Sequence, residues 1–488
     1  MLKKNDEIKL DIVRYGSNGE GIGVADGMTV FVPYTIAGER AKAHVIFAKK
    51  NFAVAKATAL ANKSPERCKP ICPQFTKCGG CTLSHMNYSA QLEIKKADVV
   101  QTFSKVAGLD LQNLEVIGSP NEYGYRNKLA VPFSLNRAGE TICGFYQSGT
   151  HNIVEMVNCP LQTDKGNVAF KIIAEYVKEY KIQGYLALPN GKQIGLLRHA
   201  VIRAVNEGVI VTLVINGNKL PHIDKLYAKL QKACGVVSLY YNINKQATNV
   251  IFGCEFVHKC GEKLLKAEKS GIKFDIGAES FLQVNDDVVD LLYGEAVKYA
   301  DPSDKDVVVN CYSGAGFLSG MLAKSAKEVV GIEIVSEAST LADNLAKENG
   351  LDKIMNNITG DVEIEFPKVV KQAEKSGKNV IFMLDPPRKG VDFTTLKLIK
   401  KQKPKKIVYI SCNPQTLSRD VGILVGSLDW SEELNQNTAA QNGNANSGNL
   451  LKKVENFKPQ YKITKNKCFD MFPQTAHVES VVLLELCE

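Results

Sequence analysis

The sequence predicts an α/β protein in which a small β-barrel, a mixed α+β region and a doubly wound parallel sheet follow one another. Three observations predict this organisation. Short apolar runs alternate with helical stretches after residue 276, which is the pattern of a parallel sheet covered by helices. Short alternating strands separated by glycine turns fill residues 1–60, as in small barrels. The 488 residues are enough for about three domains of roughly 100–200 residues each.

The predicted barrel begins at the N-terminus. Apolar and polar residues alternate at 8–12, 28–33 and 40–45, and a glycine-rich turn lies at 19–23. Alternation with a period of two places one side of each strand on a core and the other in water. We therefore assign residues 1–60 to one small barrel.

Residues 61–275 are predicted to form a central region of mixed strands and helices, with a cysteine-rich segment at about residues 65–95. Residues 201–214 alternate on both sides of Asn206-Glu207-Gly208, a pattern that predicts a hairpin.

The C-terminal region, residues 276–488, is predicted to hold the parallel sheet. Its strands are expected at 307–310, 329–333, 380–384 and 407–410, and a last strand at 480–485 is expected to close the sheet. Residues 431–449 are rich in Asn, Gln, Ser and Gly, which predicts a surface loop or a disordered insert.

Charge and composition narrow the class of partner. Lys and Arg outnumber Asp and Glu by 61 to 52, a net charge of +9, which suits a polyanion such as nucleic acid. The N-terminus is polar from Lys3 onward, and no apolar run has the roughly 18 residues of a membrane span. We expect a cytoplasmic protein without a membrane partner, whose 13 cysteines serve metal binding or catalysis rather than disulfides.

A glycine turn follows the first strand of the predicted sheet. Residues 307–310 run into Tyr312-Ser313-Gly314-Ala315-Gly316, and Glu333 ends the next strand. Such a turn lets a ligand approach the backbone, and the acid can accept hydrogen bonds from ribose hydroxyls. The next glycine is Gly320, one residue too late for the dinucleotide fingerprint, so a nicotinamide site is disfavoured.

Two candidate catalytic residues follow later strands. Asp385 is followed by two prolines that fix the chain, and Cys412 stands just before Asn413-Pro414. Carboxyl ends of parallel strands are where doubly wound sheets place their active sites. A thiol near a helix N-terminus is expected to favour its thiolate, which is the nucleophilic form.

A second set of cysteines has the spacing of a metal site. Cys72, Cys78 and Cys81 form a C-x5-C-x2-C run, and Cys159 follows in Asn-Cys-Pro. Four thiolates can bind Zn²⁺ or a [4Fe–4S] cluster, and the spacing leaves both open. Cys68 is a possible substitute ligand.

Taken together, these motifs resemble the RNA uracil-5-methyltransferase family over nearly the whole chain. The matching stretches are residues 281–285, 312–316, 385–388, 411–414 and 472–479, together with Glu333. The resemblance implies that Cys412 is a nucleophile that adds to C6 of a uridine and that Glu479 is the base. It also implies S-adenosylmethionine as methyl donor, held by Gln283, Tyr312, Gly314, Gly316, Glu333 and Asp385. An aspartate is usual in the family where this chain has Asn310, which puts the contacts to the donor's amino group in doubt.

The resemblance further implies a TRAM domain, an OB-like RNA-binding barrel, for residues 1–60. It favours a [4Fe–4S] cluster on Cys72, Cys78, Cys81 and Cys159, and 23S ribosomal RNA as the substrate of a monomeric enzyme. Phe281 is expected to stack on the flipped base, with core packing as the alternative. Arg126 and Lys128 are expected to contact RNA, with a plain solvated face as the alternative. A tRNA uracil methyltransferase, an RNA-binding module with weak catalysis and a DNA cytosine-5 enzyme are the competing interpretations.

Overall fold

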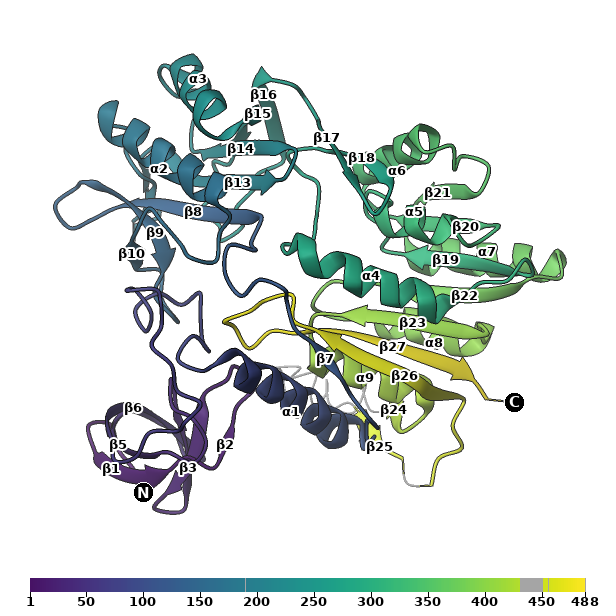
Figure 1. The fold of residues 1–488 in the computed structure, drawn as a ribbon, viewed down its shortest axis with the longest axis horizontal. Helices are drawn as coiled ribbons and strands as arrows, with labels where there is room; N and C mark the ends of the chain where they lie inside the picture. The colour runs from purple at the N-terminus through teal and green to yellow at the C-terminus, as the bar shows by residue number, and fades with distance from the viewer. Residues whose placement is uncertain (189, 431–450, 455, 488) are drawn as a thin grey trace.

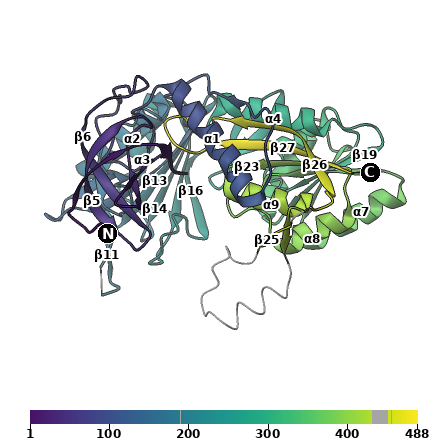
Figure 2. The same cartoon turned by 90° about the horizontal axis from the view of Figure 1, so that it is seen from below.

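The computed structural model describes residues 1–188, 190–430, 451–454 and 456–487. The predicted insert at 431–449 lies outside these residues. Three large sheets follow one another along the chain, and Figures 1 and 2 show the barrel and the central sheet on one side of the molecule and the C-terminal sheet on the other. The α/β fold class with an N-terminal barrel is confirmed.

The barrel consists of six strands in the order β1-β5-β6-β4-β3-β2. Inward positions such as Val30, Ala43 and Val45 are fully buried, as the period-two pattern predicts. The strands are β1 (Glu7–Asp11), β2 (Arg14–Tyr15), β3 (Gly21–Ala25), β4 (Met28–Val32), β5 (Arg40–Ala48) and β6 (Phe52–Leu60).

The central region holds a seven-stranded sheet in the order β10-β9-β8-β13-β14-β15-β16. The predicted hairpin is confirmed, because β13 and β14 pair with Val205 opposite Gly208. Helices α2 (Asp164–Glu179) and α3 (Ile223–Cys234) pack on one face. The strands are β8 (Lys128–Leu135), β9 (Thr141–Tyr146), β10 (Ile153–Glu155), β13 (Leu197–Val205), β14 (Gly208–Ile215), β15 (Val236–Ile243) and β16 (Glu255–Gly261), with a small pair β11 (Leu186–Ala187) and β12 (Gln193–Ile194).

The C-terminal sheet has eight strands in the order β21-β20-β19-β22-β23-β27-β26-β7. The first five are parallel, and β27 and β26 run antiparallel to their neighbours. The strands are β7 (Val116–Ile117), β19 (Asp306–Cys311), β20 (Val329–Glu333), β21 (Met355–Thr359), β22 (Asn379–Leu384), β23 (Lys406–Ser411), β26 (Tyr461–Phe469) and β27 (Glu479–Leu486).

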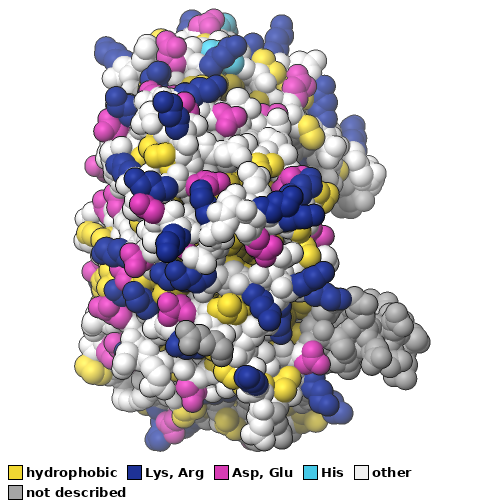
Figure 3. All heavy atoms as spheres, turned by 90° about the vertical axis from the view of Figure 1, so that its right-hand side faces the viewer, with side chains coloured by type: hydrophobic (Ala, Val, Ile, Leu, Met, Phe, Trp, Pro, Cys, Tyr) yellow, Lys and Arg dark blue, Asp and Glu magenta, His cyan; other side chains and the backbone are white. Residues whose placement is uncertain are grey.

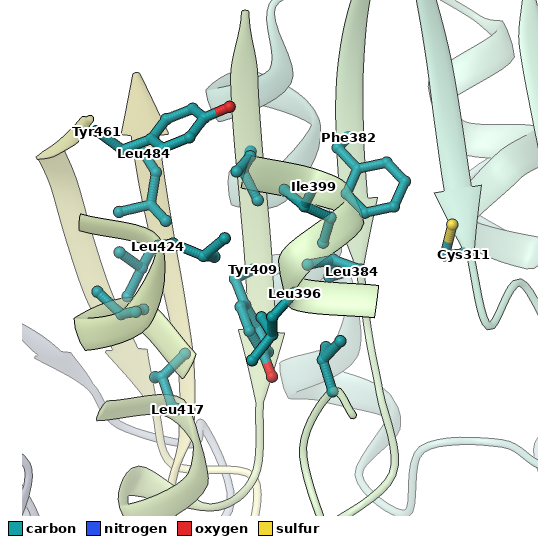
Figure 4. Close-up of a cluster of buried hydrophobic side chains, with 14 of the residues drawn as sticks. Cys311, Phe382, Leu384, Leu396, Ile399, Tyr409, Leu417, Leu424, Tyr461 and Leu484 are labelled. Atoms are coloured by element: carbon teal, nitrogen blue, oxygen red, sulfur yellow. The ribbon is translucent and has the colours of Figure 1, made fainter. Parts of the chain in front are cut away.

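Helices cover both faces of this sheet, because successive side chains of a strand point to opposite faces. Phe382 and Leu384 of β22 pack under α7, α8 and α9, whereas Ile381 and Met383 pack under α4, α5 and α6. Figure 4 shows the first of these layers around Tyr409. The helices are α1 (Tyr88–Ala107), α4 (Asp286–Ala300), α5 (Phe317–Ala323), α6 (Ser336–Glu348), α7 (Val362–Lys375), α8 (Phe393–Gln402) and α9 (Pro414–Val425).

The structure differs from the expected organisation in two ways. The strand expected to close the sheet, β27, lies inside it, because β26 and β7 pair beyond it. The limits 61–275 also cut across the packing: α1 and β7 join the C-terminal sheet, and the hairpin of β17 (Leu265–Lys269) and β18 (Ile272–Ile276) packs with α4 and α5. Periodicity identifies a strand but not the sheet that it joins.

The surface carries mixed charge. On the outer face of the C-terminal domain, Figure 3 shows basic and acidic side chains interspersed and hydrophobic ones scattered. The net positive charge is therefore not gathered into one patch on this face. Among the described residues, the helices lack the combination of length and apolar character that a bilayer span requires.

Candidate active site

Strand register brings the candidate catalytic residues together at one edge of the C-terminal sheet. Ser411, the last residue of β23, lies opposite Ser480 of β27, so Cys412 and Glu479 extend from paired positions. Leu384 of β22 lies opposite Tyr409 of β23, and Asp385 follows it. Three residues that are far apart in the sequence thus meet because their strands are neighbours.

These residues line a cavity of about 610 Å³ between the central and C-terminal regions. Nine of the residues expected at the catalytic, donor or RNA sites contribute to its wall: Arg126, Phe281, Gln283, Tyr312, Gly314, Glu333, Asp385, Cys412 and Glu479. Two others do not. Lys128 lies outside the wall, and Gly316 caps α5 with its missing Cβ facing Ala342, so Gly316 serves helix packing.

The glycine loop leaves room for a ligand. Gly314 has φ +55°, and a Cβ there would meet no atom within 4 Å, so open space faces the loop. Glu333 accepts hydrogen bonds from the backbone N–H of Gly314 at 2.9 Å and of Val335 at 2.8 Å. These bonds fix its carboxylate at the cavity wall, and its remaining lone pairs can accept hydroxyl donors.

Asp385 has a partner that sequence reasoning missed. The hydroxyl of Tyr293, on α4, donates to Asp385 at 3.1 Å, and Tyr293 also lines the cavity. Burial raises the pKa of Asp385 to about 6, and the Tyr293 hydrogen bond opposes that rise. No motif marks Tyr293, because only the packing of α4 on the sheet brings it to Asp385.

Cys412 is half-buried, and burial raises its pKa to about 11. The negative charges of Glu479 and Asp385 also raise it, whereas the charge and hydrogen bond of Arg388 lower it. The expectation of a favoured thiolate is therefore wrong for the free protein, because desolvation and two acids outweigh the position of Cys412 before α9.

Glu479 is 3% exposed, and burial holds its pKa well above the usual range of a glutamate. Asp385 adds to this rise, and the positive charge of Arg388 opposes it. A carboxylate of raised pKa is a stronger base. Arg388 thus acts on both candidate catalytic groups, a role that its place in Asp-Pro-Pro-Arg did not reveal.

The expected RNA-contacting residues lie in different surroundings. Phe281 is 72% exposed at the cavity, so it is not part of the core. Lys128 is partly buried, and burial together with the charges of Arg203 and Arg126 lowers its pKa to about 8. This environment differs from a plain solvated face. Arg203 is 5% exposed, and its Nη1 has no hydrogen-bond partner among the described residues.

Asn310, the departure from the family pattern, lies in the cavity wall. Its Nδ2 donates to Ser319 at 2.9 Å, and its Oδ1 has no partner within the described part of the chain. The amide therefore keeps one unpaired but buried acceptor, without the charge of an aspartate.

The fold brings Cys159 close to Cys72, Cys78 and Cys81 of the cysteine-rich segment. Burial raises the pKa of Cys81 to about 12, and the charges of Cys159, Cys78 and Cys72 raise it further. The backbone N–H of Gly80 donates to Cys78 Sγ at 3.4 Å, and that of Leu161 faces the Cys159 thiol. Within the described ranges, no group of three or more His, Cys, Asp or Glu side chains has a geometry ready to hold a metal.

Comparisons with known proteins agree with the site. The sequence profile of the tRNA (uracil-5-)-methyltransferase family matches residues 87–428, and that of the TRAM domain matches residues 2–58. The chain is 37% identical to an uncharacterized RNA methyltransferase of Clostridium acetobutylicum, over 99% of this chain and 98% of the relative. It is 35% identical to one of Halalkalibacterium halodurans, over 99% and 98% respectively.

Among solved structures, the fold is similar to that of the Pyrococcus abyssi tRNA (uracil-54, C5)-methyltransferase in complex with S-adenosyl-L-homocysteine. The TM-score is 0.69 at 24% identity, over 98% of this chain and 100% of the other. This likeness extends to the whole fold. The chain belongs to the tRNA/RNA uracil-5-methyltransferase family and carries an N-terminal TRAM domain.

Proposed function

We propose that this protein transfers a methyl group from S-adenosylmethionine to C5 of a uridine in 23S ribosomal RNA, through a covalent bond between Cys412 and C6. The observation that carries the proposal is the convergence of a thiol, a buried carboxyl group and a guanidinium in one cavity. Cys412, Glu479 and Arg388 all line it.

The cavity suits a cationic methyl donor. Glu333 and Asp385 line the part next to the open glycine loop at Gly314. When bound, S-adenosylmethionine supplies an electrophilic methyl group on a positively charged sulfur. A cation there would favour the charged forms of the nearby acids and of Cys412. Donor binding is thus expected to offset the burial that raises the pKa of Asp385 and of Cys412 in the free protein.

Cys412 activates the uracil. C5 of uracil is a weak nucleophile, and addition of the Cys412 thiolate to C6 gives an enolate with electron density on C5. That carbon then takes the methyl group, and the electron pair of the former carbon–sulfur bond stays on the donor's sulfur. Arg388 stabilises the thiolate through its charge and hydrogen bond.

Glu479 completes the reaction. After methylation C5 still carries its hydrogen, so a base must take that proton before the double bond can reform. The Glu479 carboxylate accepts it, the C5–C6 double bond returns and the Cys412 thiolate leaves. The net change replaces one C5 hydrogen with a methyl group and releases one proton. The apolar neighbours Val478 and Val481, both buried, keep the carboxylate basic.

The RNA is expected to enter from the central region. Phe281, exposed at the cavity, offers a face on which a flipped uracil can stack, for about 1–3 kcal/mol. Arg126 at the cavity and Lys128 nearby provide positive charge for phosphates. Burial lowers the pKa of Lys128 to about 8, so its ammonium group is still mostly charged at neutral pH and can pair with an RNA phosphate.

The four cysteines are proposed to hold a [4Fe–4S] cluster. They fit such a group because Cys81 and Cys159 lie close enough to the thiols of Cys72 and Cys78 for these to raise their pKa. Backbone N–H groups also face the thiols of Cys78 and Cys159, as thiolate ligands require. When bound, the cluster would crosslink the segment at residues 72–81 to Cys159. We expect the holoenzyme to be a cytoplasmic monomer.

The barrel and the cysteine cluster together favour ribosomal RNA, and tRNA is the second candidate because the similar Pyrococcus enzyme is a tRNA methyltransferase. The test uses transcripts of 23S rRNA and of tRNA that carry tritium at C5 of uridine. Methylation at C5 releases tritium to water. We expect donor-dependent release from 23S rRNA with wild-type protein. Release from tRNA alone would contradict 23S rRNA as the substrate. Release from neither RNA would contradict methylation at C5 of uridine.

A further inference from the structure

The segment that carries Glu479 into the sheet is held mainly by other parts of the chain. This base loop, residues 470–478, joins β26 to β27 and ends next to Glu479. Lys95 of α1 forms a buried ion pair with Asp470 at 2.5 Å and donates to the carbonyl of Phe472 at 3.2 Å. The hydroxyl of Tyr125 donates to the carbonyl of Pro473 at 3.0 Å. The first half of the loop is therefore fixed by α1 and the central region.

Gln474, at the middle of the loop, adopts an unfavourable backbone conformation. Its φ is +72°, in the left-handed region that is unfavourable for a non-glycine residue. Such a residue stays there only when its surroundings hold it. Its N–H donates to Gln91 at 2.9 Å, its side-chain oxygen accepts from Gln91 at 3.2 Å, and its Nε2 donates to Glu122 at 3.3 Å. Gln474 is 1% exposed, so water does not replace these partners.

The remaining anchor comes from the cysteine-rich segment, directly after Cys81. The backbone N–H groups of Thr82 and Leu83 both donate to the carbonyl of Gln474, each at 3.0 Å. The hydroxyl of Thr82 accepts from the N–H of Ala476 at 3.2 Å. Thr82 therefore bridges two positions of the base loop, three and five residues before Glu479.

An apolar cluster closes the same junction. Leu83 and Met86 of the cysteine-rich segment pack with Ile36 of the barrel and Ile94 of α1, and Ala476 packs against this cluster. The second half of the loop thus rests on the cysteine-rich segment. Among the described residues, Thr82 is the one partner outside the loop whose side chain is hydrogen-bonded to Ala476.

We propose that Thr82 is a positioning residue for Glu479 that acts through Gln474 and Ala476. The cysteine-rich segment thereby controls the rate at which Glu479 removes the C5 proton. This inference rests on the proposed role of Glu479 as base. Cys412 lies between β23 and α9, outside the base loop, so thiol addition does not depend on this contact. Loss of the Thr82 contact therefore displaces the Glu479 carboxylate without displacing Cys412.

The consequence is a specific kinetic signature. If Glu479 is displaced while Cys412 is not, the C6 adduct forms and C5 is methylated, but the proton leaves slowly. The methylated adduct then accumulates during turnover. A general loss of structure would lower adduct formation and turnover together, so the two effects are separable.

The experiment uses the full-length holoprotein with Thr82→Val, which keeps the shape and the backbone N–H but removes the hydroxyl. Thr340→Val, at an exposed hydroxyl on α6 that bonds only its own helix at Ser336, is the matched control, and Thr82→Ser is the conservative rescue. Tritium release from C5 and the fraction of protein in a denaturation-resistant RNA adduct are measured together, with iron content and S-adenosylhomocysteine binding as checks of integrity.

For Thr82→Val we expect tritium release to slow by about 10- to 100-fold, as a displacement of about 1 Å can cause, while the adduct fraction rises. Thr82→Ser and Thr340→Val should resemble wild type. Normal release, or adduct that falls in step with release, would overturn the inference. If Thr82→Val no longer binds S-adenosylhomocysteine, Thr82→Ala replaces it under the same criteria.

Glu479→Gln in the same assay separates this inference from the proposed function. If Glu479→Gln accumulates adduct and Thr82→Val does not, the positioning role fails and the role of Glu479 stands. If Glu479→Gln forms no adduct, the proposed base itself fails.

Discussion

The two groups of cysteines with proposed functions, Cys412 and the set at Cys72, Cys78, Cys81 and Cys159, share one property and differ in another. Burial is the largest cause that raises the pKa of Cys412, to about 11, and of Cys81, to about 12. The next causes differ: acids and Arg388 surround Cys412, whereas other thiols surround Cys81. Burial therefore does not separate a nucleophile from a ligand, but the neighbours do.

The largest effect should follow from removing the thiol next to the acids. Cys412→Ala is expected to lower methylation by at least about 10⁴-fold, as loss of a nucleophile does in other enzymes. Binding of S-adenosylhomocysteine, measured by calorimetry, should be unchanged, because the donor contacts lie on other strands. Retained turnover in this variant would assign the nucleophile elsewhere.

Glu479→Gln should come next, with methylation lowered by about 10²- to 10⁴-fold, the usual contribution of a general base. Because thiol addition precedes proton removal, this variant should retain RNA in a covalent adduct that migrates slowly under denaturing conditions. Wild-type protein and the double variant with Cys412→Ala provide the controls. An adduct that survives in the double variant would contradict the assignment of Cys412.

The sequence was sufficient to place Asp385 and Cys412 near each other, for a physical reason. Carboxyl ends of adjacent parallel strands meet at one edge, so Asp385 and Cys412 could be placed together from strand order. Tyr293 and Thr82 could not be predicted. Tyr293 reaches Asp385 only through the packing of α4, and Thr82 contacts residues almost 400 positions later in the chain. Local patterns contain no information about such contacts.

Substitution within the second group of cysteines, Cys72, Cys78, Cys81 and Cys159, should have a different effect from substitution of Cys412. In anaerobically purified protein, Cys81→Ser is expected to abolish iron binding and the absorption at about 400 nm. S-adenosylhomocysteine should still bind. Tritium release should fall by about tenfold or more, because residue 82 follows directly and holds the base loop. Cys143→Ser is the matched control, because burial also raises the pKa of the Cys143 thiol. Zinc in place of iron in wild-type protein would correct the identity of the metal.

The smallest effect concerns the cation that distinguishes Cys412. Arg388→Gln removes a charge and a hydrogen bond that lower the pKa of Cys412, so that pKa should rise. Below its pKa, the thiolate fraction of Cys412 grows about tenfold per pH unit. Alkylation of the Cys412 peptide by iodoacetamide, followed by mass spectrometry between about pH 7 and 10, should therefore be slower in the variant at every pH. Equal rates would show that Arg388 does not act on the thiol.

The fold shows the same division between what local patterns predict and what they do not. The β13–β14 hairpin was predicted correctly because Asn206-Glu207-Gly208 determines it locally. The place of β27 inside the sheet was not, because β7, from the other half of the chain, pairs beyond β26. Residues that depend on one strand and its neighbour can be read from the sequence, and junctions between regions cannot.

The central claim is that Cys412, and no cysteine of the second group, bonds to the base. RNA containing 5-fluorouridine tests it directly, because fluorine at C5 cannot be removed as a proton and the adduct cannot break down. After reaction with wild-type holoprotein and S-adenosylmethionine, the crosslinked peptide is digested and sequenced by mass spectrometry. The account predicts a nucleotide on Cys412. A nucleotide on Cys72, Cys78, Cys81 or Cys159, or no crosslink at all, would contradict it.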